Sequence, residues 1–458
     1  MTFGHTAAVT PSHTAAVTQG RTDLLAHGLG GSTDLPIPVT YALIGGAWAL
    51  AASFAILLVA WKTPRLDASR VRRVLPGLTR VVDSPVVRGV VGVLSVALAA
   101  WVGAASVLGP QDSSNALMGV FYVLVWVGLV PASLIAGPVW RVVSPVRALH
   151  RGVCVLLRRN SSRGVATLPA VGVVPAVVGL FAFVWLELAS SDPGLVAAVR
   201  LWCLVYVLVL LVGALVFGDR WFAAADPFEV FSGVVARLSW LRRDRESGQL
   251  AAVSPLDNAS SLPVRRGTVA VIATLLGSTA FDSLAQTPFW KDLARGAGDP
   301  VVARTLGLLA CIAIVGTAFW LAARATGGVT REERAKLPGL LAHSLIPIVV
   351  GYFVAHYLTY LVEKGQQSVF TLFDPFDRGW NPLGIADASV NYTLSSHPSV
   401  LASITVLAVV IGHIVGVTLA HDASLRILPK RHVLTGELAL MMVMVLYTFL
   451  GLYLLFGA

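Results

Sequence analysis

The stretch VTYALIGGAWALAASFAILLVAW at residues 39–61 holds 23 consecutive positions without a charged side chain. A helix of about 20 apolar residues crosses the roughly 30 Å of hydrocarbon in a bilayer. This stretch is therefore predicted to be a transmembrane helix, and nine similar runs follow it. The ten predicted spans lie at residues 39–61, 87–108, 115–137, 170–190, 195–218, 265–286, 301–323, 338–362, 398–420 and 436–456.

Composition supports the same fold class over the whole chain. Of 458 residues, 56% are hydrophobic and 13% are charged, against about 25% charged in an ordinary soluble domain. A soluble fold cannot hide so much apolar surface, so the lipid bilayer has to cover it. We predict an all-α, polytopic transmembrane helix bundle of about ten spans with two interfacial amphipathic helices.

The positive charge of the chain predicts the orientation of the spans, not a nucleic-acid partner. Lys and Arg number 34, and 27 of them lie in five alternate connections between spans. Loops rich in Lys and Arg stay in the cytoplasm. We therefore predict a bacterial cytoplasmic (inner) membrane protein with both termini outside. The five basic connections are residues 62–88, 138–169, 219–266, 324–337 and 421–435.

Three regions are expected along the chain. Residues 1–38 form an extracytoplasmic N-terminal tail, 39–266 hold the first five spans, and 267–458 hold the other five. The second half contains a long outer loop at 364–397, which is dense in turn residues and aromatic side chains. Such a loop suits either a lid over an outer site or a plug at the level of the lipid headgroups.

Two cytoplasmic connections look like a direct repeat. The third span is followed by WRVVSP at residues 140–145, and the fifth by WFAAADP at 221–227. A polar N-cap followed by Pro signals the start of a helix, and Glu229 supplies the carboxylate of a capping box. The helices that follow are amphipathic, so each is predicted to lie on the inner leaflet. They would contact lipid or a partner, or brace the bundle, and we favour the brace.

Ionisable side chains at membrane depth are the candidate functional residues, because burying them in a bilayer is costly. Imidazole and carboxylate groups together suit a divalent transition metal such as zinc. His356 and His397 are therefore the candidate metal ligands, and Asp282 and Glu363 are the candidate catalytic carboxylates. Glu187 lies at a similar predicted depth. The alternative for each residue is a hydrogen-bonded position in the core.

A second set of polar residues is expected in the inner half of the membrane. Gly412 and Gly416 form a G-x-x-x-G pattern around His413, which predicts a close approach by another helix. The set consists of His343, His413, His421 and Glu437.

Several enzyme classes lack their motifs in this chain. There is no H-E-x-x-H, no G-x-S-x-G and no G-x-x-x-x-G-K-[ST] in the sequence. These motifs mark zinc proteases, esterases with a nucleophile elbow, and nucleotide-driven machines. The sequence therefore disfavours all three classes.

Three short stretches carry a resemblance to a known family. They are HGLGGSTDLPIP at 27–38, WFAAADPFEV at 221–230 and FDSLAQTPFW at 281–290. Together they resemble polytopic membrane proteins of high-GC bacteria that carry the name fenitrothion hydrolase. The resemblance runs from about residue 27 to the C-terminus. It implies a membrane-bound hydrolase of organophosphorus triesters and assigns no catalytic residue.

The sequence thus favours a polar, metal-binding site near the outer face that acts on a small-molecule substrate. In an enzyme, a bound cation would lower the pKa of a water, and Asp282 or Glu363 would take its proton. One alternative is a small-solute transporter, because five plus five spans give halves of opposite orientation, as in inverted-repeat carriers. Another is a non-catalytic subunit that binds haem or copper through the inner histidines.

Overall fold

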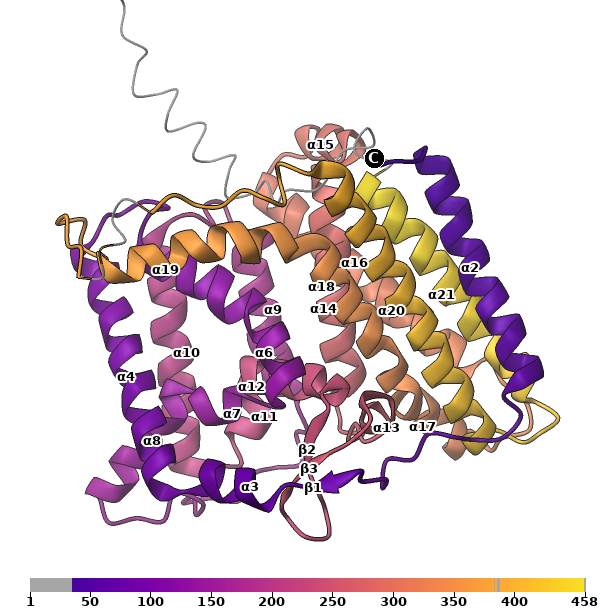
Figure 1. The fold of residues 1–458 in the computed structure, drawn as a ribbon, viewed down its shortest axis with the longest axis horizontal. Helices are drawn as coiled ribbons and strands as arrows, with labels where there is room; N and C mark the ends of the chain where they lie inside the picture. The colour runs from indigo at the N-terminus through magenta and orange to yellow at the C-terminus, as the bar shows by residue number, and fades with distance from the viewer. Residues whose placement is uncertain (1–34, 383, 385–387, 457–458) are drawn as a thin grey trace, which may run out of the picture.

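A computed structural model describes residues 35–382, 384 and 388–456, and this part of the chain is predominantly helical. Eight helical stretches are long and apolar enough to cross a membrane, and they form most of the bundle in Figure 1. Seven are single helices: α2 (Val39–Ala60), α4 (Pro85–Leu108), α10 (Val196–Phe217), α14 (Thr268–Gln286), α16 (Pro300–Arg324), α20 (Pro398–Ile427) and α21 (Val433–Phe456). The eighth is the helical stretch Arg331–Phe373.

Two of the ten predicted spans do not form a single helix long enough to cross a membrane. The third is a bent pair of helices, Ala116–Val127 and Leu129–Ala136, which meet at 41° and can be counted as one span. The fourth contains α9 (Val174–Leu188), an apolar helix of 15 residues, which is shorter than the length of about 20 that a bilayer requires. The structure therefore gives eight spans by length and composition, or nine with the bent pair.

The bend in the third span has a local cause. The span consists of α5 (Ala116–Met118), the π-helix η1 (Gly119–Val127) and α6 (Leu129–Ala136). Pro131 cannot donate a backbone hydrogen bond, and its ring crowds the carbonyl of Val127 four residues earlier. The Gly128 N–H instead donates to the Val123 carbonyl at 2.9 Å, five residues back. The proline and the wide turn together explain the break.

The eighth predicted span extends beyond its predicted end. It consists of α17 (Arg331–Leu341), the 3₁₀ turn η3 (Ala342–Leu345), α18 (Ile346–Thr359), the π-helix η4 (Tyr360–Lys364) and α19 (Gly365–Phe373). Figure 1 shows α19 lying across the upper end of the bundle. The long outer loop predicted at 364–397 therefore begins as a helix.

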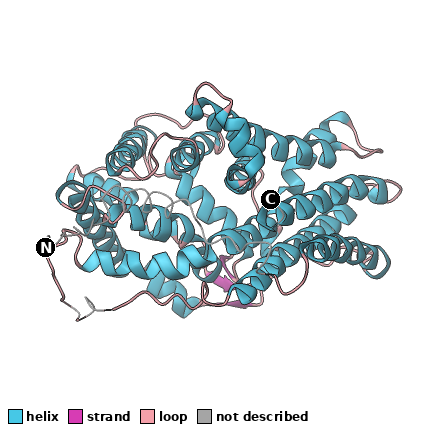
Figure 2. Cartoon of the chain, turned by 90° about the horizontal axis from the view of Figure 1, so that it is seen from above, coloured by secondary structure: helices cyan, strands magenta, loops and turns pink. Residues whose placement is uncertain are grey.

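A small antiparallel sheet lies at the opposite end, within the first half of the chain, and Figure 2 shows its strands among the helices. Its strand order is β1 (Arg73–Val74), β3 (Leu250–Ala252), β2 (Leu241–Arg243). Arg243 hydrogen-bonds Asp83 at the end of α3 (Pro76–Asp83), and this contact lowers the pKa of Asp83. The sheet therefore ties residues 73–83 to the connection 219–266. Further short elements are α13 (Pro255–Ala259) and α15 (Pro288–Arg295).

The two repeat copies form helices where their caps predict them. The first gives α7 (Trp140–Val143) and α8 (Pro145–Leu156), and the second gives α11 (Phe222–Ala225), α12 (Pro227–Val235) and the 3₁₀ turn η2 (Ala236–Leu238). Ser144 caps α8 and Asp226 caps α12 through their side-chain oxygens. The predicted capping box is wrong, because the Glu229 carboxylate binds Arg147 instead.

The packing of these helices does not confirm that both lie on the surface of the bundle. Seven of the nine residues of α12 are buried, so α12 lies inside the bundle. In α8 the apolar Leu156 is 82% exposed and the charged Arg147 is 3% exposed. The polar face of α8 thus points inward and the apolar face outward, where lipid would cover it. An amphipathic pattern shows that a helix has one polar and one apolar face. It does not show whether the apolar face contacts protein or lipid.

The G-x-x-x-G pattern in α20 marks a close approach to α18. A Cβ atom added at Gly412 would lie 2.7 Å from the Pro347 carbonyl oxygen, and one at Gly416 would lie 2.7 Å from the Ser344 carbonyl oxygen. On the facing side, a Cβ atom at Gly351 would lie 2.5 Å from the Ala408 carbonyl oxygen. The two backbones therefore touch, as the packing interpretation predicted.

We expect Gly412→Ala to destabilise the protein. The added methyl group forces α18 and α20 apart, and overpacking of this kind costs about 1–3 kcal/mol. Thermal unfolding in detergent would measure the loss. Gly45→Ala is the matched control, because nothing lies within 4 Å of a Cβ atom at Gly45. Equal melting temperatures for the two variants would contradict the close approach.

Candidate outer site

A buried histidine–carboxylate pair lies between α14 and α18. His356 Nε2 is 2.7 Å from Asp282 Oδ2, and the residues are 1% and 6% exposed. Tyr357 donates its hydroxyl to the same carboxylate oxygen at 3.4 Å. Asp282 is on α14 and His356 on α18, so the pair joins two helices from separate predicted spans. Two candidate residues are thus brought together.

A second carboxyl group belongs to the same cluster. Glu187, near the end of α9, is 7% exposed, and its Oε2 atom is buried without a hydrogen-bond partner. It interacts electrostatically with Asp282 and with the phenol groups of Tyr122, Tyr357 and Tyr360. A cluster with two carboxyl groups and one imidazole can hold and exchange protons, which is the basic requirement for acid–base chemistry.

A cavity lies beside η4, which continues α18 beyond His356. Its volume is about 240 Å³, and Tyr360 is part of its wall. Tyr360 follows His356 by four residues, one helical turn, so this part of the cavity wall lies on the same side of the helix as His356. The other lining residues are Ser113, Ser114, Asn115, Ala116, Met118, Gly119, Val123, Lys364, Gln367, Ser368 and Thr371.

Both π-helical segments line the cavity. Gly119 and Val123 come from η1, whereas Tyr360 and Lys364 come from η4. Such segments are rare and are frequently found at functional sites, because the wide turn costs stability and redirects side chains. Two of them facing one polar cavity mark this region as the candidate functional site.

Glu363 and His397 have other partners. Glu363 accepts hydrogen bonds from the backbone N–H of Ser395 at 2.9 Å and from its hydroxyl at 2.7 Å. Glu363 therefore anchors the end of the outer loop to η4. His397 is exposed at the N-cap of α20 and hydrogen-bonds the Thr393 carbonyl oxygen. Neither side chain hydrogen-bonds the Asp282–His356 pair.

The predicted metal centre is not seen among the described residues alone. Within the described part of the chain, no group of three or more His, Cys, Asp or Glu side chains is placed to hold one. Metal sites in proteins usually need at least three such ligands. The residues therefore give no geometric support to the predicted metal centre, nor to a copper site of these residue types at the inner histidines.

The outer loop packs on the bundle through aromatic side chains. Trp101 of α4 stacks on Trp380 at 6.1 Å between ring centroids and contacts Phe376 edge-on at 5.3 Å. Asp374 accepts hydrogen bonds from the backbone N–H groups of Gly379 and Trp380. These contacts suit the plug interpretation, with aromatic rings at headgroup level. His27 and Asp34, ionisable residues that precede the first predicted span, lie outside the described residues.

Sequence reasoning missed part of the cluster. Tyr357 and Tyr122 were not among the candidates, and the π-helices were not predicted; Trp126, the neighbour of Tyr122 on η1, contacts Phe183, Phe231 and Phe353 through its ring. Trp126 and Tyr122 lie one turn apart on η1, within an apolar run that looked like an ordinary span. Aromatic residues in a span usually serve packing, so only the position of Tyr357 next to His356 gave a signal.

Comparisons with protein-family models, with curated proteins and with solved structures found no match. Function therefore has to be argued from the geometry of the site and from the resemblance in the sequence.

Proposed function

We propose that this protein is a membrane-embedded hydrolase whose site lies in the outer half of the bundle. The observation that carries the proposal is the buried Asp282–His356 pair, one helical turn from Tyr360 in the cavity wall. A small-molecule substrate would enter the cavity, and the resemblance to fenitrothion hydrolases favours an organophosphorus triester. The pair supplies the acid–base function that hydrolysis needs.

The roles of the residues follow from their contacts. Asp282 accepts the hydrogen bond from His356 and so orients the imidazole and stabilises its protonated form, as a carboxylate does in catalytic dyads. His356 would take a proton from the attacking water, and the phosphorus–oxygen bond to the aryl group would break as the new one forms. The leaving phenolate would then receive a proton from the cluster. Tyr360, which lines the cavity, would hold the substrate there.

Release of the phenol tests the proposal directly. Protein purified in detergent and given an aryl phosphotriester should produce the phenol faster than a detergent blank. Chelation of divalent metal then separates two mechanisms, because a rate that survives it assigns the acid–base chemistry to the Asp282–His356 pair alone. No release above the blank would refute hydrolysis of this substrate class, and loss of activity on chelation would restore the metal hypothesis.

A small-solute transporter is the second candidate. The bent span with its π-helix is the observation that favours it, because carriers form their sites from interrupted helices. A carrier would release no phenol in detergent and would move a solute across proteoliposomes. The same Asp282–His356 pair would then couple solute movement to a proton.

We propose that both termini lie outside and that the small sheet lies in the cytoplasm. The sheet and α3 gather several arginines of the basic connections at one end of the bundle (Figure 1), which supports the predicted orientation. In a chain without its native cysteines, a cysteine introduced at position 70 should react with an impermeant thiol reagent only after cells are opened. A cysteine at position 378 should react in intact cells. Labelling of position 70 in intact cells would reverse this topology.

A further inference from the structure

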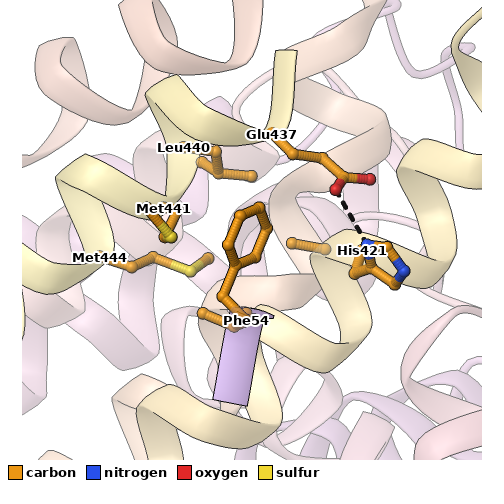
Figure 3. A pocket seen from close by; sticks show the side chains of 8 residues that line it. Phe54, His421, Glu437, Leu440, Met441 and Met444 are labelled. Carbon is orange, nitrogen blue, oxygen red and sulfur yellow. Dashed lines mark hydrogen bonds and ion pairs between the residues drawn. The ribbon is translucent and has the colours of Figure 1, made fainter. Parts of the chain in front are cut away.

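A second histidine–carboxylate pair lies near the opposite end of the bundle. His421 of α20 places Nδ1 2.9 Å from Glu437 Oε2 of α21 (Figure 3). Its Nε2 atom lies 2.8 Å from the Trp61 carbonyl oxygen. The carbonyl can only accept, so Nε2 carries a proton. At 2.9 Å the other contact also needs a proton, either on Nδ1 or on the carboxyl oxygen. The pair therefore holds a proton that can transfer between the two groups.

The same pair borders a very small cavity. Figure 3 shows Phe54, Leu440, Met441 and Met444 around it, and its volume is about 10 Å³, enough for about one water. The second oxygen of Glu437, Oε1, is buried and has no hydrogen-bond partner. A buried carboxyl oxygen without a donor costs free energy, so it indicates a group that exchanges its partner.

His413 lies between the two pairs with an unpartnered nitrogen. It is fully buried, its Nδ1 atom hydrogen-bonds the Val409 carbonyl oxygen at 2.9 Å, and its Nε2 atom has no partner. The Val409 carbonyl can only accept, so Nδ1 carries the ring proton and donates it in this hydrogen bond. The Nε2 atom of the neutral ring therefore presents a lone pair to the interior. His413 and His421 are eight residues apart on one face of α20, about 12 Å along the helix. Val417, between them, lines the small cavity.

Tyr352 continues this series toward the outer site. Its ring lies 6.3 Å from the His413 ring, measured between centroids, and it is 8% exposed. Tyr352 is one turn before His356 on α18, so the two side chains share a face. The series thus runs from Asp282–His356 through Tyr352 and His413 to His421–Glu437.

We infer that these residues form a proton-conducting column through the right-hand part of the bundle in Figure 1, where α18, α20 and α21 pack together. A proton enters at Asp282–His356, is taken up and released at His413 Nε2, and leaves through Glu437 and His421. Chains of water would bridge the gaps between these groups, the longest being the roughly 12 Å between His413 and His421. No bond other than those to the moving proton forms or breaks, and the driving force is the proton gradient or the membrane potential.

The chemistry of the column supports transport over a purely structural role. A structural histidine in a membrane core is expected to have both ring nitrogens satisfied, because unpaired polar atoms are costly there. Both His413 Nε2 and Glu437 Oε1 lack hydrogen-bond partners among the described residues; the first belongs to the residue between the two pairs and the second to the inner pair. The column would conduct protons whether or not the outer site is a hydrolase.

Proton flux in proteoliposomes tests the column. Vesicles with an internal pH-sensitive dye and a potassium gradient, made permeable by valinomycin, should acidify faster with the protein than without it. His413→Asn removes the titrating nitrogen, and Glu437→Gln keeps the hydrogen bond to His421 but cannot release a proton. Each should lower the flux by about tenfold or more, since losing a positioned proton carrier has effects of this size or larger.

Thr418→Val is the matched control, because Thr418 lies on α20 and its hydroxyl only contacts the Ile414 carbonyl oxygen. Its flux should equal that of the unsubstituted protein. Gel filtration in detergent would confirm that each variant is folded. Because the two substitutions lie on different helices, the test still works if one of the variants fails to fold. Flux equal to that of protein-free vesicles, or unchanged flux in both folded variants, would overturn the inference.

Discussion

His356→Ala should lower phenol release from an aryl phosphotriester by on the order of a hundredfold or more, the usual scale for losing a positioned general base. The substitution removes the imidazole that Asp282 orients at 2.7 Å. Asp282→Asn should cause a similar loss, because an amide of the same shape cannot stabilise a protonated imidazole. Steady-state rates of purified variants, with gel filtration to confirm folding, would measure both effects.

His397→Ala is the control for this prediction. His397 is exposed at the start of α20 and hydrogen-bonds only a backbone carbonyl, so its loss should leave the rate unchanged. If instead His397→Ala and His356→Ala each abolished activity, the two histidines would act at one centre, as the metal hypothesis predicted. Hydrolysis that survived both His356→Ala and Asp282→Asn would place the active site elsewhere in the chain.

The fold was predictable because lipid imposes a simple rule on sequence. A spanning helix needs a long apolar run, and each of the ten predicted runs contains a helix in the structure. The rule fails where backbone geometry departs from the α-helix. The bend before Pro131 and the π-helix at Gly119–Val127 arise from one proline and from packing against η4, which the hydropathy of the run does not reveal.

The site was predictable only in part, for a related reason. Asp282 and His356 are 74 positions apart in the sequence, and only their similar predicted depth suggested that they meet. Depth does not fix the direction in which a side chain points around a helix. Glu363 has a matching depth, yet its carboxylate turns to Ser395. Charge at membrane depth thus identified candidate residues, whereas helix rotation and packing determined which of them pair.

A buried arginine–glutamate pair connects the two repeat copies. Arg147 of α8 donates two hydrogen bonds to Glu229 Oε2 of α12, from Nη2 at 2.6 Å and from Nε at 3.2 Å. The side chains are 4% and 9% exposed. Arg147 also lies 3.8 Å from Asp219, and its guanidinium is 4.6 Å from the centre of the Phe222 ring. One arginine therefore holds the first copy against the second.

Glu229→Ala should destabilise the protein by about 3–5 kcal/mol, because it leaves the Arg147 charge buried without its main partner. Thermal unfolding in detergent would show this as a large fall in melting temperature. The double variant Arg147→Met with Glu229→Leu should recover most of the loss, since apolar side chains of similar volume can replace a buried pair at little cost. Glu332→Ala provides the exposed comparison, because its partner Lys336 is 62% exposed and surface pairs contribute about 0–1 kcal/mol. If the double variant were no more stable than Glu229→Ala, the pair would hold α8 and α12 in position through its hydrogen-bond geometry, which apolar packing cannot replace.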